Sequence, residues 1–148
     1  MRKIAQLTFL LVCITILSTA NSIAQSSLEE ALQKAKTENK YVFVNFSGSD
    51  WCRSCILLKK TILNTEEFKK FASEKLVILD VDFPRLKKNS LSDEQTAVNE
   101  KLAAKYNSNG QFPTILLLDS NAKVMGKTGY KKVSPKDYVS HIQSIIAQ

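Results

Sequence analysis

The feature that most constrains this chain is a pair of cysteines two residues apart, Cys52 and Cys55, preceded directly by Trp51. The pair follows a short β-prone run at 41–46 and a polar break, and it precedes apolar residues at helical spacing. We therefore expect the thiols to open a helix where a strand ends. Two such thiols can exchange disulfides with another protein, so redox chemistry is the leading hypothesis.

The rest of the chain reads as alternating helices and strands without a repeat or a linker, which favours one α/β domain with a mixed sheet between helices. The first strand, apolar at most positions, is expected to be central and covered on both faces. A polar loop is expected at 83–93. The predicted strands are Tyr41–Phe46, Leu76–Val81, Thr114–Leu118 and Lys123–Lys127, the second one buried and the last two a hairpin. Five helices are predicted. The first ends near Glu38, the second begins at Cys52, and the third begins after Asn64 or Thr65. The fourth spans Glu94–Tyr106, and the last begins at Pro135 with Ser134 as N-cap.

The N-terminus has the pattern of a signal peptide. Arg2 and Lys3 precede an apolar run at 7–17, and the small residues in Ser22-Ile23-Ala24 stand where signal peptidase needs them. The alternative is an uncleaved membrane anchor, but the run is shorter than the ~20 residues that a spanning helix needs. We expect a signal peptide at 1–24, a mature domain at 25–148, and export to the periplasm rather than a membrane-anchored form.

The charge of the chain does not indicate nucleic-acid binding. Cleavage would remove two positive and no negative side chains, so the formal net charge would fall from +7 to +5. The lysine pairs are spread along the chain without interleaved aromatic residues, which is typical of solvated faces. We expect no nucleic-acid partner.

The position of Cys52 at a helix N-terminus favours the thiolate, because unpaired backbone N–H groups and the helix dipole stabilise negative charge there. Arg53 adds a positive charge beside it. A lower pKa also lowers nucleophilicity, so the net gain in rate is only about threefold. We expect most of the rate advantage to have other sources. Cys52 is a good leaving group, a substrate can reach it, and Cys55 is held ready to resolve the mixed disulfide.

Other uses of the two cysteines fit less well. A structural bridge that closes so short a loop is worth about 2 kcal/mol, less than half the value for a loop of about a hundred residues. Zinc needs two further ligands, and the mature chain offers no other cysteine and only His141. Haem attachment needs a histidine where Ile56 stands. We expect no metal site and no cofactor, and we assign His141 no catalytic role.

With Phe112-Pro113-Thr114 before the third strand and Gly129 beyond the hairpin, the chain resembles the thioredoxin superfamily along its mature length. The resemblance implies a thioredoxin-like fold, with Cys52 as the exposed nucleophile and Cys55 as the buried resolving thiol. It also implies that Pro113 is cis and that the backbone of Phe112 contacts the substrate chain. Trp51 is either part of the site or simply a packed aromatic residue, and the sequence leaves both interpretations open.

The chain departs from thioredoxin itself at two places. It has Arg53 and Ser54 between the cysteines where thioredoxin has Gly-Pro, and Asn45 where thioredoxin has a buried aspartate. Asn45 cannot accept a proton. We therefore predict that deprotonation of Cys55 relies on water or on Asp50.

The leader and the residues before Trp51 resemble those of thioredoxin-like domains in bacterial envelope thiol:disulfide interchange proteins. This implies an extracytoplasmic oxidoreductase for protein disulfides, a reductant or redox relay rather than a strong oxidase, with a membrane-bound electron donor. The alternative is a non-catalytic binding module that holds a partner protein in a groove near Pro113. The retained Cys52 and Cys55 favour the enzyme.

Overall fold

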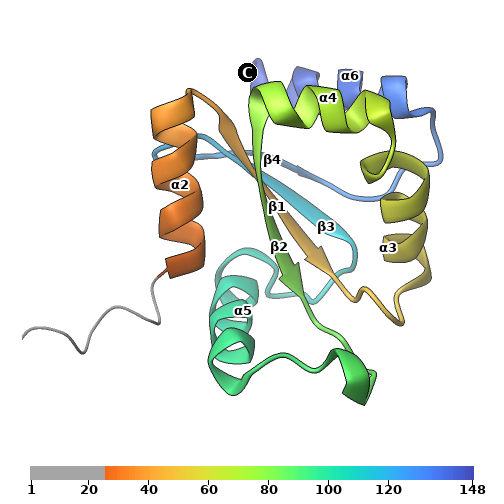
Figure 1. The fold of residues 1–148 in the computed structure, drawn as a ribbon. Coiled ribbons are helices and arrows are strands. Elements are labelled where there is room, and N and C mark those ends of the chain that lie inside the picture. Colours follow the sequence, from red (N-terminus) through yellow and green to blue (C-terminus); the bar gives the residue numbers. More distant parts are fainter. Residues whose placement is uncertain (1–25) are drawn as a thin grey trace, which may run out of the picture.

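A computed structural model describes residues 26–148 of the chain (Figure 1). The elements follow one another in the order α2 (Ser26–Glu38), β1 (Tyr41–Ser47), α3 (Arg53–Leu58), η1 (Lys59–Leu63), α4 (Glu66–Lys75), β2 (Leu76–Asp82), η2 (Lys87–Asn89), α5 (Asp93–Tyr106), β3 (Thr114–Leu118), β4 (Val124–Thr128) and α6 (Pro135–Ile146). The predicted alternation of helices and strands is confirmed.

The strands form one sheet in the order β2-β1-β3-β4. Strand β1 runs parallel to β2 and antiparallel to β3, and β3 and β4 pair as the predicted antiparallel hairpin. Because β1 has a neighbour on each side, its predicted central position is confirmed. The sheet is mixed, as a thioredoxin-like fold requires.

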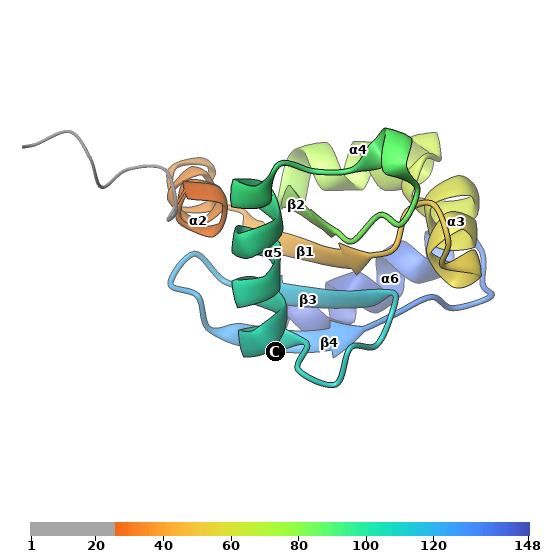
Figure 2. The ribbon, with the colours of Figure 1, turned by 90° about the horizontal axis from the view of Figure 1, so that it is seen from below.

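Helices cover both faces of this sheet (Figures 1 and 2). The side chains of β1 alternate between two cores. Phe43 points to the face where α3, α4 and α6 pack, and it contacts Phe68 edge to face at 5.6 Å between ring centroids. Val42 and Val44 point to the opposite face, which α2 and α5 cover. The apolar run of β1 is explained by this burial on both sides.

Strand β2 differs from the prediction, which made it a buried strand. It is an edge strand with only one neighbour, and Ile78 keeps 43% of its surface exposed. Asp80 is exposed as well. An apolar run alone does not distinguish a strand covered on both faces from an edge strand, because the number of neighbours is set by pairing with distant segments.

The helix that follows Cys52 is less regular than predicted. It runs as an α-helix to Leu58 and then as a single π-helical stretch, η1, whose Ile62 is fully buried. Thr65 caps the next helix, α4, by accepting the N–H of Phe68 at 3.4 Å. The predicted restart after Asn64 or Thr65 is confirmed.

Helix α6 closes the fold against the hairpin. Ser134 caps it through the N–H of Asp137 at 3.1 Å, as the sequence predicted. The buried Tyr138 donates its hydroxyl to the carbonyl of Gly129 at 3.0 Å, and burial raises the pKa of that phenol. A Cβ on Gly129 would lie 2.9 Å from the carbonyl oxygen of Pro113, so this glycine lets the chain beyond β4 approach the segment that precedes β3.

Within residues 26–148, no helix combines the length and the apolar character needed to cross a membrane. The predicted signal peptide at 1–24 lies outside the described residues.

The central position of β3 yields a stability prediction. Leu117 is fully buried, so Leu117→Ala should lower the free energy of unfolding by about 2–5 kcal/mol through lost burial and a residual cavity. The control Val133→Ala, at a loop position that is 44% exposed, should change it by no more than about 0.5 kcal/mol. Denaturant unfolding measures both values, and equal losses would contradict this account of the core.

Candidate active site

The turn between β1 and α3 positions the two cysteines at the start of the helix. The carbonyl of Gly48 accepts the N–H of Trp51 at 3.2 Å and the N–H of Cys52 at 2.9 Å, which closes the chain tightly after the strand. Cys52 is in an extended conformation, with φ −81° and ψ 103°, and the helix starts at the next residue. Cys52 is therefore the N-cap, and the predicted opening of a helix by the thiols is confirmed.

Cys52 and Cys55 form a disulfide, with their Cα atoms 5.2 Å apart. The Sγ atom of Cys52 also accepts the backbone N–H of Cys55 at 3.3 Å and lies 3.6 Å from the hydroxyl of Ser54. An N–H group aimed at a sulfur stabilises negative charge on it, both as an attacking thiolate and as a leaving group. This contact distinguishes Cys52 from Cys55.

Exposure does not distinguish the two sulfurs. The resemblance implied an exposed Cys52, but Cys52 is only 7% exposed and Cys55 is 5% exposed. That expectation is wrong for the disulfide form, because each sulfur covers part of the other and the turn folds closely around Cys52. The assignment of Cys52 as the nucleophile therefore depends on its N-cap position.

Trp51 is a packed aromatic residue directly before the cysteine pair, and its part in the chemistry of the site stays a prediction. Its Nε1–H donates to the carbonyl of Phe83 at 2.7 Å, and its ring meets Phe112 edge to face at 5.6 Å between centroids. Arg85 lies over the indole with its Cζ 3.7 Å from the ring centroid. A Cβ on Gly48 would lie 2.3 Å from the indole, so glycine is required beneath the ring.

Phe112 and Pro113 lie beside this cluster, and the bond between them is cis. Phe112 also meets Phe83 edge to face at 5.5 Å between centroids. The structure therefore brings Phe112 against Trp51, next to the disulfide. Arg53 is exposed at the start of α3.

Asp50 supports the site in a way the sequence did not indicate. Its carboxylate accepts the backbone N–H groups of Arg85 and Leu86 and the side-chain amide of Asn89, each at 2.9 Å. The Arg85 N–H is the main reason why the pKa of Asp50 lies below its ordinary value, with the Asn89 amide next. Asp50 thus braces the loop after β2, and its part in deprotonating Cys55 stays a prediction.

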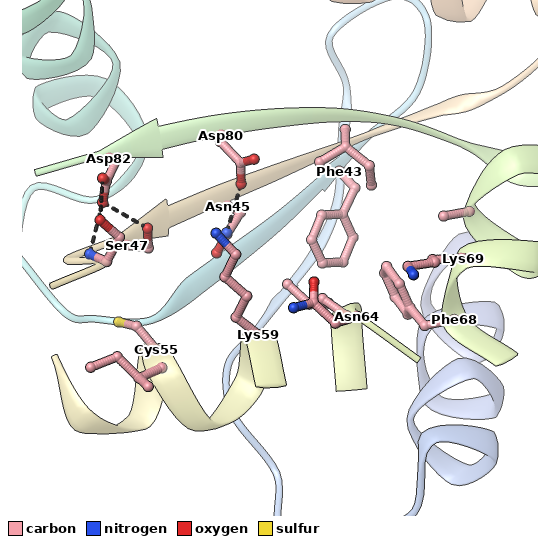
Figure 3. Close-up of a pocket in the computed structure, with 15 residues that line it drawn as sticks. Phe43, Asn45, Ser47, Cys55, Lys59, Asn64, Phe68, Lys69, Asp80 and Asp82 are labelled. Atoms are coloured by element: carbon pink, nitrogen blue, oxygen red, sulfur yellow. Dashed lines mark hydrogen bonds between the residues drawn. The ribbon is translucent and has the colours of Figure 1, made fainter. Parts of the chain in front are cut away.

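A pocket of about 410 Å³ opens behind Cys55, between β2 and the helices α3 and α4 (Figure 3). Asn45 lies in its wall, 9% exposed, and donates its amide to Asp80 at 2.8 Å. The side-chain Oδ1 atom of Asn45 is buried and has no hydrogen-bond partner among the described residues. Figure 3 shows Lys59 reaching from η1 into the pocket toward Asn45.

The carboxylates of this pocket come from β2, and sequence reasoning missed them. Asp80 and Asp82 are two residues apart on one face of β2, and the parallel register pairs them with Asn45 and Ser47. Asp82 accepts the hydroxyl of Ser47 at 3.0 Å and the backbone N–H of Ser49 at 2.8 Å. The sequence signal that could have indicated them is the spacing of two aspartates, two residues apart, at the end of a predicted strand.

Within the described part of the chain, no group of three or more His, Cys, Asp or Glu side chains is placed to hold a metal ion. His141 is on α6, with its Nε2 atom 2.9 Å from the hydroxyl of Thr128. The site is thus a cysteine pair at a strand-to-helix junction, flanked by aromatic residues and a cis proline. Such a site on this fold defines a dithiol-disulfide exchange protein.

Comparisons with known proteins agree. A family profile described as thioredoxin-like matches residues 23–120. Disulfide bond reductase DsbH of Chlamydia pneumoniae is 35% identical over 127 residues, which are 86% of this chain and 75% of that protein. Thioredoxin-related protein DsbJ of the same organism is 32% identical over 68% of this chain and 28% of its own length.

A solved structure of a DsbH oxidoreductase superposes with a TM-score of 0.75 at 34% identity, covering 88% of this chain and 92% of that one. The chain belongs to the thioredoxin-like family. Its fold and its disulfide-forming cysteine pair make it a thiol:disulfide oxidoreductase.

The close contact between Gly48 and Trp51 yields a prediction. In Gly48→Ala the added methyl group must displace the indole and weaken its bond to Phe83, lowering the free energy of unfolding by about 1–3 kcal/mol. Trp51 is the sole tryptophan, so its fluorescence emission should move to longer wavelength. An exposed control, Ser140→Ala, should leave the spectrum unchanged. An unaltered spectrum in Gly48→Ala would contradict the packing described.

The bracing by Asp50 yields a prediction about pH. Because folding lowers its pKa, Asp50 stabilises the loop at pH values above its ordinary 3.8, and this stabilisation is lost as pH falls through the lower folded value. Protection of the Arg85 and Leu86 amides against hydrogen exchange should decrease over that acid range. In Asp50→Ala their protection factors should be low at neutral pH as well.

The matched control is Asp119→Ala, which removes a carboxylate that accepts backbone N–H groups in the turn between β3 and β4. It should leave protection at Arg85 and Leu86 intact. Protection factors in Asp50→Ala equal to those of the unaltered protein would show that Asp50 does not brace the loop.

Proposed function

We propose that this protein is an extracytoplasmic reductant or redox relay that exchanges disulfides with protein substrates through Cys52 and Cys55. The observation that carries the proposal is the Cys52 sulfur, which joins the disulfide and accepts the N–H of Cys55 at a helix N-cap. The direction of electron flow is supported by the 35% identity to a protein named as a disulfide bond reductase.

The reaction begins from the dithiol. The Cys52 thiolate attacks one sulfur of a substrate disulfide, so that bond breaks, a mixed disulfide forms, and the departing substrate thiolate takes up a proton. Cys55 then loses its proton and attacks the Cys52 sulfur. The mixed disulfide breaks, the second substrate thiolate leaves, and the Cys52–Cys55 bond seen in the structure forms. Two electrons pass from the protein to the substrate.

The pocket behind Cys55 gives its proton a route to water during the second step. Cys55 lines this pocket together with Asn45, Asp80 and Asp82, and Asp80 is exposed at the edge of the sheet. Among the mostly apolar side chains that line this pocket, the two carboxylates are therefore the acceptors available to the proton. This arrangement supports Cys55 as the resolving thiol.

The place of action is proposed from the predicted signal peptide. We assign residues 1–24 to a cleaved signal peptide and residues 25–148 to the mature domain, which would act in the periplasm. Each turnover leaves the protein oxidised, so a donor must return two electrons before the next one. We assign that part to a membrane-bound electron donor, because the substrate side of the membrane is separated from the reductants of the cytoplasm.

A binding module is the second candidate function, and one observation favours it. A pocket of about 320 Å³ lies next to Pro113 and Gly129, where an extended partner segment could be held without turnover. Binding of a partner in this pocket would not require the cysteine pair. The two functions therefore differ in whether loss of Cys52 abolishes activity.

The experiment is reduction of insulin disulfides by dithiothreitol in the presence of the protein. Cys52→Ser should reduce the rate to that of dithiothreitol alone, because the first nucleophile is lost. Cys55→Ser should form mixed disulfides that persist, because nothing resolves them. Equal rates for the unaltered protein and Cys52→Ser would instead favour the binding module.

A further inference from the structure

Hydrogen bonds hold the loop between β2 and α5 against the active-site turn and the start of α5. The N–H of Phe83 donates to the carbonyl of Ser47 at 2.8 Å, and the buried Asn99 of α5 donates to the carbonyl of Asp82 at 2.8 Å. Asp50 accepts three hydrogen bonds from the segment 85–89. The loop therefore has a defined place beside the start of α3, as both ribbon views show (Figures 1 and 2).

This anchoring places the side chain of Arg85 on Trp51, the neighbour of Cys52 in the chain. Its guanidinium lies 3.7 Å over the ring of Trp51, the residue directly before Cys52, and the side chain is exposed. No carboxylate in the part of the chain described here forms an ion pair with Arg85. Because stacking on an indole leaves the edge of a guanidinium open, its N–H groups can bind a carboxylate from another molecule.

The loop that carries Arg85 is basic. The segment 83–92 contains three basic side chains and no acidic one, and Arg53, the residue directly after Cys52, is exposed. The two carboxylates beside the turn are already engaged: Asp50 accepts the loop's own N–H groups, and Asp82 accepts hydrogen bonds from Ser47 and Ser49. Leu86 adds an apolar surface that is 47% exposed.

We infer that Arg85 selects substrates, favouring protein segments that carry an acidic side chain next to the disulfide to be reduced. The substrate carboxylate would meet the guanidinium of Arg85 while the disulfide sulfur meets Cys52, and the exposed Arg53, next to Cys52 in the chain, would add to the attraction. Complementary charge beside the reacting sulfur accelerates the encounter of substrate and protein and holds the substrate segment in register. The inference rests on the proposed function and names the substrate class of the same site.

The test uses two synthetic peptides with the same disulfide ring, one flanked by glutamates and the other by lysines. With the reduced protein at low salt, kcat/KM should be about tenfold higher for the glutamate peptide, and the ratio should decrease at high salt. Arg85→Gln should lower the ratio severalfold, whereas Arg85→Lys should retain most of it. A change in Cys52 reactivity would alter both rates equally, so the ratio isolates recognition.

The matched control is Lys36→Gln, which removes an exposed cation from α2, far from the disulfide, and should leave the ratio unchanged. A ratio near one, or a ratio that Arg85→Gln leaves unaltered, would overturn the inference while leaving the oxidoreductase activity in place. Failure to reduce either peptide would overturn the proposed function and this inference with it.

Discussion

The chemistry of this protein depends on one hydrogen bond, from the backbone N–H of Cys55 to the sulfur of Cys52. That bond exists because the chain turns sharply after β1, with the carbonyl of Gly48 accepting two N–H groups, and enters a helix at Arg53. The sheet and its two cores serve as the platform that holds the turn. Gly48 is part of the same constraint, since any side chain there would occupy the space of Trp51.

The polar groups near the buried Cys55 differ in charge according to the strand that carries them. A neutral amide, Asn45, occupies the buried position on the central strand, where an unpaired carboxylate would be costly to ionise. The carboxylates of Asp80 and Asp82 lie instead on the edge strand, nearer water, and hydrogen bonds from β1 and the turn after it hold them in place. Cys55 therefore borders a mostly apolar pocket whose polar groups, Asn45, Asp80 and Asp82, lie along β1 and β2.

Local patterns predicted most of the fold and the heart of the site. Helix caps such as Ser134, the apolar strands and the spacing of Cys52 and Cys55 are properties of short segments, and the structure confirms them. The exposure of β2, the bracing by Asp50 and the stacking of Arg85 on Trp51 depend on partners more than thirty residues away. A single sequence states which residues are present, but it does not state which distant segments pair.

The most direct test of the central claim is the pH dependence of alkylation in the fully reduced protein, with the modified cysteine identified by mass spectrometry. If the N–H of Cys55 stabilises the Cys52 thiolate, Cys52 should react first, with a pKa clearly below the ordinary value of about 8.5. A Cys52 that titrates at or above that value, or that reacts after Cys55, would contradict the account.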